Sequence, residues 1–233
     1  SLAAGTAQVA LSSPLSTLQT LPVDLAGARV VVRRHITLAQ VFPADVFQPG
    51  ATTAAADQVL FHENGTWTTC WLNGSRQWVS AADPAGTSQN AKIIAPGTGL
   101  MVKTGALAKS VTHTGHVRTT PWRASLLTGQ NLLASPWPVD GTPQTLGLTA
   151  GNGLTASTSM ATADQIQLWK GDATPGAATY DGWWLLKRGS TLIWTAKGSA
   201  SLKDVSATLP LRSGWAFFLK AQPATADHGW ILP

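Results

Sequence analysis

The stretch that decides the fold is residues 56–79, which read ADQVLFHENGTWTTCWLNGSRQWV. Its apolar runs are rich in Val, Phe, Thr and Trp, and the dipeptides Asn64-Gly65 and Asn73-Gly74 separate them. Asn-Gly between such runs is the strongest short-range signal for a β-hairpin, because both residues tolerate the left-handed backbone of a tight turn. The stretch therefore predicts a meander of short antiparallel strands.

Several motifs of the first half of the chain recur in the second half in the same order. They are Pro22–Asp24 with Pro138–Asp140, Ala56–Val59 with Ala163–Ile166, Gly74–Trp78 with Gly189–Trp194, and Gly97–Lys103 with Gly214–Lys220. Such a pattern indicates an internal duplication, with insertions in the loops between motifs. We predict an all-β protein of two tandem, related antiparallel domains, each a β-sandwich or barrel-like. Residues 1–110 form the first domain, with an N-terminal strand or tail, and residues 111–233 the second.

Apolar runs elsewhere extend the prediction of strands. They lie at Ala28–Val32, Ile36–Val41, Leu100–Val102, Val111–Thr119, Ile166–Trp169, Trp183–Leu186, Leu192–Trp194 and Trp215–Leu219. Glu63 is the one Glu in the sequence, and long amphipathic helices normally use many. Helix is therefore expected only as short turns, for example at Pro43–Phe47.

The composition argues against several classes of protein. Charged residues make up 12% of the chain, and the net charge of +5 reflects few acids. The densest basic spot, Arg33-Arg34-His35, is too small for a nucleic-acid-binding face, which needs clustered Lys and Arg. No apolar run approaches the roughly 18 residues of a membrane helix. We expect neither a nucleic-acid partner nor a transmembrane segment.

No set of residues has the pattern of a catalytic or cofactor site. Cys70 is the single cysteine and is expected to be a buried, inert thiol. His113 and His116 offer two metal ligands where structural sites usually need four, so we interpret them as part of a polar linker. Asp57 and Asp164 are equivalent in the two repeats and are interpreted as turn-holding residues, not as a pair for glycoside hydrolysis. We expect no enzyme activity, no cofactor and no metal.

Trp is the most abundant aromatic residue, with 11 copies against five Phe and one Tyr. Trp rings bind sugars but also build cores and interfaces, and core packing is the favoured interpretation for any single Trp. Trp67 and Trp71 share one face of their predicted strand, whereas Trp183 and Trp184 point to opposite faces. These four residues form the candidate surface for a carbohydrate or a protein partner.

The N-terminal segment offers a candidate assembly strand. Val9 and Leu11 alternate with small or polar residues, as in a half-buried strand, and Leu15 follows them. The strand pairs either within its own domain, which is the safer interpretation, or with a neighbouring subunit by strand addition. The start Ser1–Gly5, without Met, is typical of a chain trimmed by signal-peptide cleavage. An extracellular or cell-surface location is therefore expected.

Residues 55–103 and 162–220 both contain Ala-Asp-Gln, a Trp-bearing hairpin, and a Gly before an apolar strand that ends in Lys. In this they resemble repeat units of large secreted bacterial proteins, which implies export and β-structure but transfers no active site. The leading hypothesis is a non-enzymatic secreted structural protein, a filament or cell-surface subunit whose partner is itself. The alternatives are a carbohydrate-binding adhesion protein that holds a polysaccharide with exposed Trp, and a phage or virion structural protein.

Overall fold

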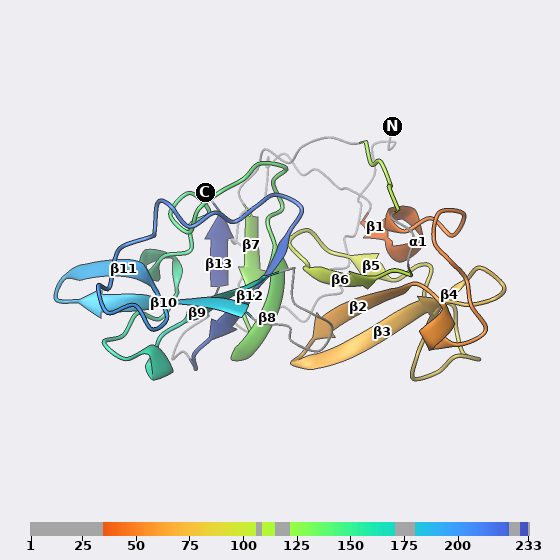
Figure 1. Cartoon of the computed structure of the whole chain (residues 1–233), viewed down its shortest axis with the longest axis horizontal. Coiled ribbons are helices and arrows are strands. Elements are labelled where there is room, and N and C mark those ends of the chain that lie inside the picture. Colours follow the sequence, from red (N-terminus) through yellow and green to blue (C-terminus); the bar gives the residue numbers. More distant parts are fainter. Residues whose placement is uncertain (1–34, 106–108, 115–121, 171–179, 224–228, 233) are drawn as a thin grey trace, which may run out of the picture. The chain divides into compact units, whose positions relative to one another are not determined.

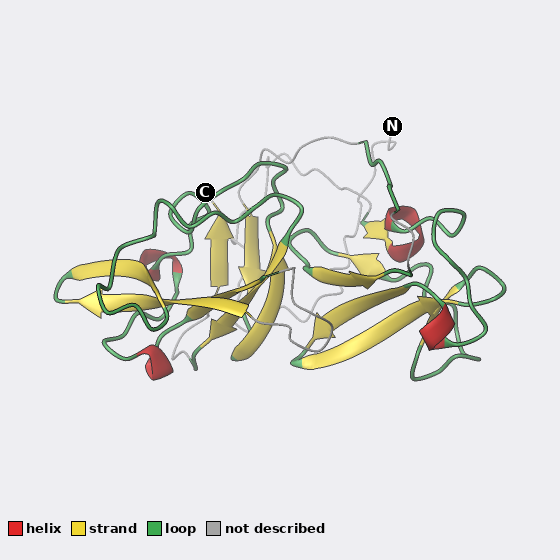
Figure 2. Ribbon diagram, in the orientation of Figure 1, coloured by secondary structure: helices red, strands yellow, loops and turns green. Residues whose placement is uncertain are grey.

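A computed structural model describes residues 35–105, 109–114, 122–170, 180–223 and 229–232. Strands make up most of the regular structure in these residues, and the helices are short turns (Figure 1, Figure 2). Neighbouring strands within each sheet run antiparallel. The prediction of an all-β protein is therefore confirmed.

The first half of the described chain forms a four-stranded sheet. Its strands are β2 (Gln58–Glu63), β3 (Thr66–Leu72), β4 (Trp78–Ser80) and β6 (Leu100–Lys103), in the order β4-β3-β2-β6. Alternate residues of β2 and β3 are buried in one hydrophobic cluster with Trp78; they are Val59, Phe61, Cys70 and Leu72. The meander predicted from residues 56–79 is present in this sheet.

The two Asn-Gly dipeptides form different turns. Asn64 and Gly65 have φ values of 51° and 76°, and they join the paired residues Glu63 and Thr66 as a tight hairpin requires. The second turn is longer, because Leu72 pairs with Trp78. There the side chain of Asn73 accepts hydrogen bonds from the N–H groups of Ser75 and Gln77, at 3.0 and 2.9 Å. A side-chain turn thus replaces the predicted tight hairpin at Asn73.

The second half forms a five-stranded sheet in the order β11-β10-β9-β12-β8. Its strands are β8 (Gly129–Ala134), β9 (Gln165–Trp169), β10 (Tyr180–Arg188), β11 (Thr191–Ala196) and β12 (Ala216–Ala221). Four of them overlap strands predicted from sequence, and β8 is the addition. The two sheets are joined where the N–H of Gly99 donates to the carbonyl of Leu132 at 3.1 Å.

Two small sheets complete the strand list: β1 (Ile36–Thr37) pairs with β5 (Ile93–Ile94), and β7 (Trp122–Ser125) pairs with β13 (Gly229–Leu232). The helical turns are α1 (Leu38–Val41), η1 (Thr53–Ala55), η2 (Ala150–Asn152) and η3 (Met160–Thr162). In the described part of the chain, no helix has the length and apolarity needed to cross a membrane.

The strand predicted at Ile36–Val41 is corrected by α1. Only Ile36 and Thr37 are extended, and the chain then turns into a helix at Leu38. Thr37 and Gln40 form a capping box, in which the backbone N–H of Thr37 donates to the Gln40 side chain at 2.9 Å. The predicted strand at 28–32 lies outside the described residues. Of the one predicted at 111–119, residues 111–114 are described and are not in a strand.

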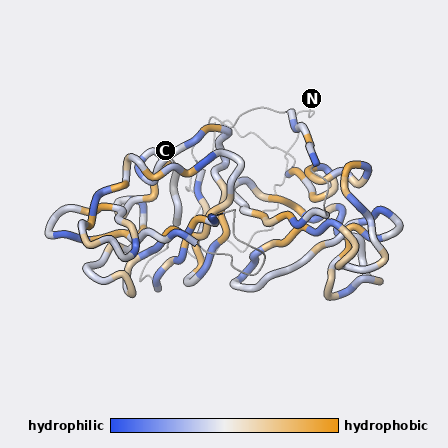
Figure 3. The backbone as a smooth tube through the Cα atoms, in the orientation of Figure 1, coloured by the Kyte–Doolittle hydropathy of each residue, from blue (hydrophilic) through white to orange (hydrophobic). Residues whose placement is uncertain are grey.

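The core consists of two main hydrophobic clusters, and each contains at least one fully buried Trp. Hydrophobic and hydrophilic residues interleave along the chain (Figure 3), as expected when strands bury one face. Trp78 lies in the cluster under the four-stranded sheet, and Trp194 in the cluster under the five-stranded sheet. Their indole N–H groups donate to the carbonyls of Phe42 and Leu148, at 2.9 and 2.7 Å. Each ring is therefore both packed and hydrogen-bonded.

Two buried aspartates hold the segments that flank β2 and β9. Asp57 accepts hydrogen bonds from the N–H groups of Gln48 and Gly105, at 2.8 and 2.9 Å. Asp164 accepts the corresponding bonds from Thr155 and Gln222, at 2.9 and 2.7 Å. Each carboxylate thus ties the chain before its strand to the chain after the closing strand, a longer-range role than the turn-holding one predicted.

Candidate functional site

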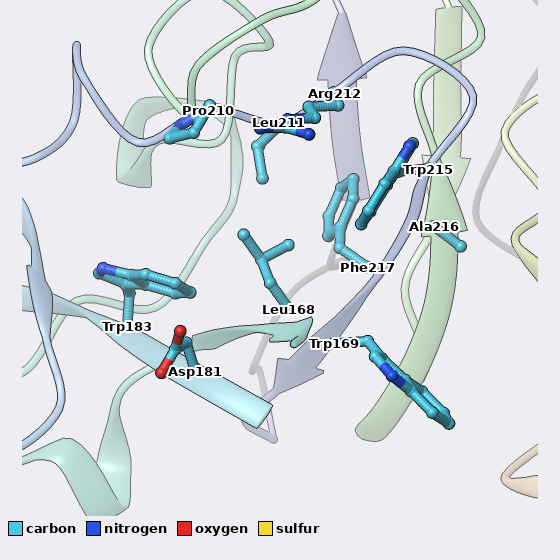
Figure 4. A pocket seen from close by; sticks show the side chains of 10 residues that line it. All are labelled: Leu168, Trp169, Asp181, Trp183, Pro210, Leu211, Arg212, Trp215, Ala216 and Phe217. Atoms are coloured by element: carbon cyan, nitrogen blue, oxygen red, sulfur yellow. The ribbon is translucent and has the colours of Figure 1, made fainter. Parts of the chain in front are cut away.

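A cleft of about 190 Å³ opens where β9, β10 and the start of β12 meet (Figure 4). The lining is mostly apolar and includes three Trp residues. It consists of Leu168, Trp169, Asp181, Trp183, Pro210, Leu211, Arg212, Trp215, Ala216 and Phe217. Concave sites lined by aromatic rings with a few polar groups are typical ligand sites.

The walls of the cleft are aromatic and its base is part of the core. Trp183 and Trp215 stand on opposite sides, with Leu168 between them (Figure 4). Phe217, at the base, belongs to the core cluster that contains Trp194. Packing into this cluster holds the base in one conformation. Trp169 lies at the rim and is exposed, as is Trp215.

A tight turn before β12 positions Arg212 and Trp215. The N–H of Trp215 donates to the carbonyl of Arg212 at 3.2 Å, and Gly214 between them has a φ of 74°. Glycine adopts this left-handed conformation without strain. The N–H of Ser213 donates to the Asp140 carboxylate at 2.8 Å, which anchors the turn. The Arg212 guanidinium consequently lies 5.4 Å from the centre of the Trp215 ring, within cation–π range.

Asp181 and Arg212 are the charged residues of the lining. Asp181 pairs with Leu168 across β9 and β10, so its side chain shares the cleft face with that of Trp183. The Asp181 carboxylate lies 2.8 Å from the ammonium of Lys170, and both side chains are about half exposed. Exposed ion pairs contribute only about 0–1 kcal/mol. Asp181 can therefore exchange this partner for a ligand hydroxyl at little cost.

The four Trp residues singled out from sequence lie in different environments. Trp183 lines the cleft and packs against the core beneath it. Trp184 and Trp71 are 8% and 5% exposed, which leaves neither ring available to a ligand. Trp67 is 42% exposed and lies at the tip of the β2–β3 hairpin. The candidate assembly strand with Val9, Leu11 and Leu15 lies outside the described residues.

Four of the functional candidates were not singled out from sequence: Trp169, Asp181, Arg212 and Trp215. The apolar runs predict strands at Trp169 and Trp215, where core packing is the usual interpretation of a Trp, but in the structure Trp215 precedes β12. One sequence signal was available. The motif Gly97–Lys103 matches Gly214–Lys220 in sequence, but Trp215 stands where the earlier motif has Thr98.

The titratable groups buried elsewhere have structural roles. Burial raises the pKa of the Cys70 thiol to about 11, so the thiol is protonated at neutral pH. Burial alone would raise the pKa of Asp57, but the N–H groups of Gln48 and Gly105 and the ammonium of Lys109 together hold it below its ordinary value. Among the described residues, no three His, Cys, Asp or Glu side chains are placed to hold a metal ion.

No family model, curated protein or solved structure matches this chain. The resemblance to repeat units of secreted bacterial β-proteins therefore stays a prediction. The geometry of the cleft is what bears on function.

Proposed function

We propose that the chain is a non-catalytic binding protein whose cleft takes a neutral carbohydrate. The observation that carries this proposal is the placement of three Trp rings around one open cleft, with one acidic and one basic side chain among them. It develops the carbohydrate-binding alternative predicted from the Trp-rich composition. The location that goes with it is extracellular or at the cell surface.

The chemistry of a sugar suits this lining. One face of a pyranose presents C–H groups that stack on an aromatic ring, and its edge presents hydroxyl groups that both donate and accept hydrogen bonds. Trp183 and Trp215 provide the stacking faces, while Asp181 accepts and Arg212 donates. The two charges cancel, so the lining suits an uncharged sugar better than an acidic one.

The cleft suits binding better than glycoside hydrolysis. Hydrolysis usually uses two carboxylates on either side of the scissile bond. Asp181 is the one carboxylate among the described residues that line the cleft, and it is paired with Lys170. At about 190 Å³, the cleft is also smaller than the roughly 300–1,000 Å³ of typical small-molecule sites. An open platform for one sugar ring fits these dimensions.

An internal duplication forms part of the proposal, with copies at residues 1–110 and 111–233. Matching hydrogen bonds at Asp57 and Asp164 support it. So does the register of the strands. Gln58 pairs with Trp71 and with Lys103. The equivalent residue, Gln165, likewise pairs with Trp184 and Lys220.

The copies differ at the residues that line the cleft. By the same register, Trp169, Asp181, Trp183, Arg212 and Trp215 correspond to His62, Thr68, Cys70, Ala95 and Thr98. The residues common to both copies hold the sheets together, whereas the aromatic and charged residues of the cleft occur in one copy. If the cleft residues served only to stabilise a fold that both copies share, both copies would contain them. It therefore supports a binding role specific to the second half.

Retention on insoluble polysaccharides tests the proposal. The matrices are cellulose, chitin, xylan and starch, and the variants are Trp215→Ala and Ile93→Ala. Both residues are exposed, and Ile93 lies in β5, outside the cleft lining, so it is the matched control. We expect the wild type to be retained on at least one matrix and Trp215→Ala to bind at least tenfold more weakly, equivalent to about 1.4 kcal/mol. Ile93→Ala should bind like the wild type.

Two outcomes contradict the proposal. One is a wild-type protein that no matrix retains. The other is a Trp215→Ala variant that binds as tightly as the wild type, since this ring offers the most exposed stacking face of the cleft. Trp183→Ala gives a second test from the opposite wall, with circular dichroism to show that the variant is folded.

Self-assembly of a secreted structural protein is the second candidate. The same exposed aromatic residues favour it, because exposed apolar patches also mark protein interfaces. The edges of β4 and β11 are less suited to it. The N–H of Trp78 donates to Asn90, and the N–H of Trp194 donates to Ser206, each at 2.9 Å, which blocks strand pairing there. Electron microscopy of the concentrated protein distinguishes polymers, which support assembly, from single particles, which contradict it.

A further inference from the structure

We infer that the carbohydrate is an extended chain of several sugar units that runs from the cleft past Trp169 and Trp215 onto the other face of the sheet. This inference rests on the proposed function and names its ligand class. It follows from a second hollow, from a continuous series of aromatic rings, and from the polar groups between them.

The second hollow has a volume of about 170 Å³ and adjoins the cleft. Trp169 and Trp215 line both of them. Gln167 lines the second hollow, whereas its neighbour Leu168 lines the cleft, as expected for alternate residues of one strand. The two sites therefore lie on opposite faces of β9 and meet at the two shared Trp residues.

Aromatic rings continue from the second hollow to the first half of the chain. The Trp169 ring lies 5.7 Å from that of Tyr180, and Tyr180 lies 5.7 Å from Phe218. Phe218 in turn lies 6.1 Å from Trp67, at the tip of the β2–β3 hairpin. Trp169, Tyr180 and Trp67 are all exposed. They provide a series of stacking faces that one sugar ring cannot fill.

The polar groups along this path suit a neutral ligand. The Gln130 amide donates to Oε1 of Gln167 at 3.2 Å, and Gln167 lines the second hollow. Side-chain amides bind hydroxyl groups without selecting a charge, whereas carboxylate or phosphate ligands are usually bound by Arg and Lys. At about 190 and 170 Å³, each hollow has room for one sugar ring but not for two. A linear neutral oligosaccharide is the occupant that uses both hollows and the rings beyond them.

Titration with sugars of increasing length tests this inference. The probes are β-1,4-linked oligosaccharides of glucose, N-acetylglucosamine and xylose, from one to six units, with binding followed by Trp fluorescence. We expect the hexasaccharide of one series to bind at least tenfold more tightly than its disaccharide. Trp67→Ala, which lies beyond both hollows, should weaken hexasaccharide binding at least fivefold and leave disaccharide binding unchanged, and Tyr180→Ala, at the second hollow, should also weaken hexasaccharide binding at least fivefold. Trp215→Ala should weaken both, and Leu192→Ala, an exposed residue outside both hollows, should weaken neither.

The outcomes separate this inference from the proposed function. If the disaccharide binds as tightly as the hexasaccharide, or if Trp67→Ala and Tyr180→Ala leave hexasaccharide binding unchanged, the extended path is wrong. The proposed function still stands in that case, provided that Trp215→Ala weakens binding. If no probe of any length binds and no polysaccharide matrix retains the wild type, both are overturned.

Discussion

Replacing Asp57 with Asn tests whether this buried carboxylate holds the first sheet together. The carboxylate is almost fully buried and accepts two backbone hydrogen bonds, from Gln48 and Gly105. It also lies 3.0 Å from the ammonium of Lys109, which is mostly buried. Asn has a nearly identical shape but no charge, and its NH₂ group cannot accept a hydrogen bond. The substitution therefore removes the ion pair and at least one bond to a charged acceptor.

The expected loss of stability is large for a change of one atom. A hydrogen bond to a charged group contributes about 1.5–3 kcal/mol, and removal of one partner of a buried ion pair costs about 3–5 kcal/mol. These contributions overlap at one carboxylate, so we expect Asp57→Asn to lower the free energy of unfolding by roughly 3–5 kcal/mol. Urea unfolding followed by Trp fluorescence measures it. Lys109→Met is the comparison variant: it breaks the same ion pair but keeps both backbone hydrogen bonds to Asp57, so the difference between the two variants measures the contribution of those bonds.

The pH dependence gives the same prediction a second readout. The pKa of Asp57 is lower in the folded protein than in the unfolded chain, so the unfolded chain binds more protons as the pH falls. The contribution of Asp57 is therefore complete above its ordinary pKa of about 4 and is lost as the pH falls through the folded-state value. Asp57→Asn should flatten this part of the stability profile. A loss below about 1 kcal/mol at pH 7, together with an unchanged profile, would refute the assigned role.

Three further predictions concern the core. Burial raises the pKa of Cys70 to about 11, so a thiol reagent at pH 8 should label it only after unfolding. The free energy of unfolding should also decline above about pH 9, where the thiol ionises in the unfolded chain. Rapid labelling of the folded protein would contradict this. In the described structure the buried hydroxyl of Thr195 has no hydrogen-bond partner. Thr195 pairs with Trp184 as Val79 pairs with Trp71 in the four-stranded sheet, so a Val fits this position. Thr195→Val should therefore raise the free energy of unfolding by about 1 kcal/mol. A lower melting temperature would count against it. Trp194→Phe leaves the carbonyl of Leu148 without its donor and should cost about 1–3 kcal/mol in urea unfolding, whereas wild-type stability would show that the bond is unimportant.

The sequence predicted the strands well where the alternation of side chains and the residues of the turns both indicate a hairpin. Asn64-Gly65 forms the tight turn that its residue types favour. The alternation of Trp183 and Trp184 also predicted their opposite faces, and the two rings pack in different clusters. In contrast, the apolar run at 36–41 resembles a strand. The capping box at Thr37 and Gln40, a short motif within it, favours the helix instead.

Long-range contacts explain what sequence could not predict. Asn is disfavoured in strands, yet Asn131 lies in β8 and is nearly buried. Its side-chain amide donates to the carbonyls of Leu127 and Leu219, at 2.7 and 3.2 Å, and Leu219 is distant in sequence. The cleft depends on distant segments in the same way. Asp181 and Arg212 line one cleft only because β9, β10 and the turn before β12 are adjacent in the folded sheet.

Oxidation of Trp side chains, mapped by mass spectrometry with and without a bound sugar, tests the central claim most directly. The protein is treated with N-bromosuccinimide alone and in the presence of the oligosaccharide that binds most tightly, and each Trp is followed separately. The proposed site predicts that the sugar protects Trp215, Trp183 and Trp169, the three Trp residues that line the cleft. An oligosaccharide that binds but leaves these residues as reactive as in the free protein would contradict the claim that the cleft is the binding site.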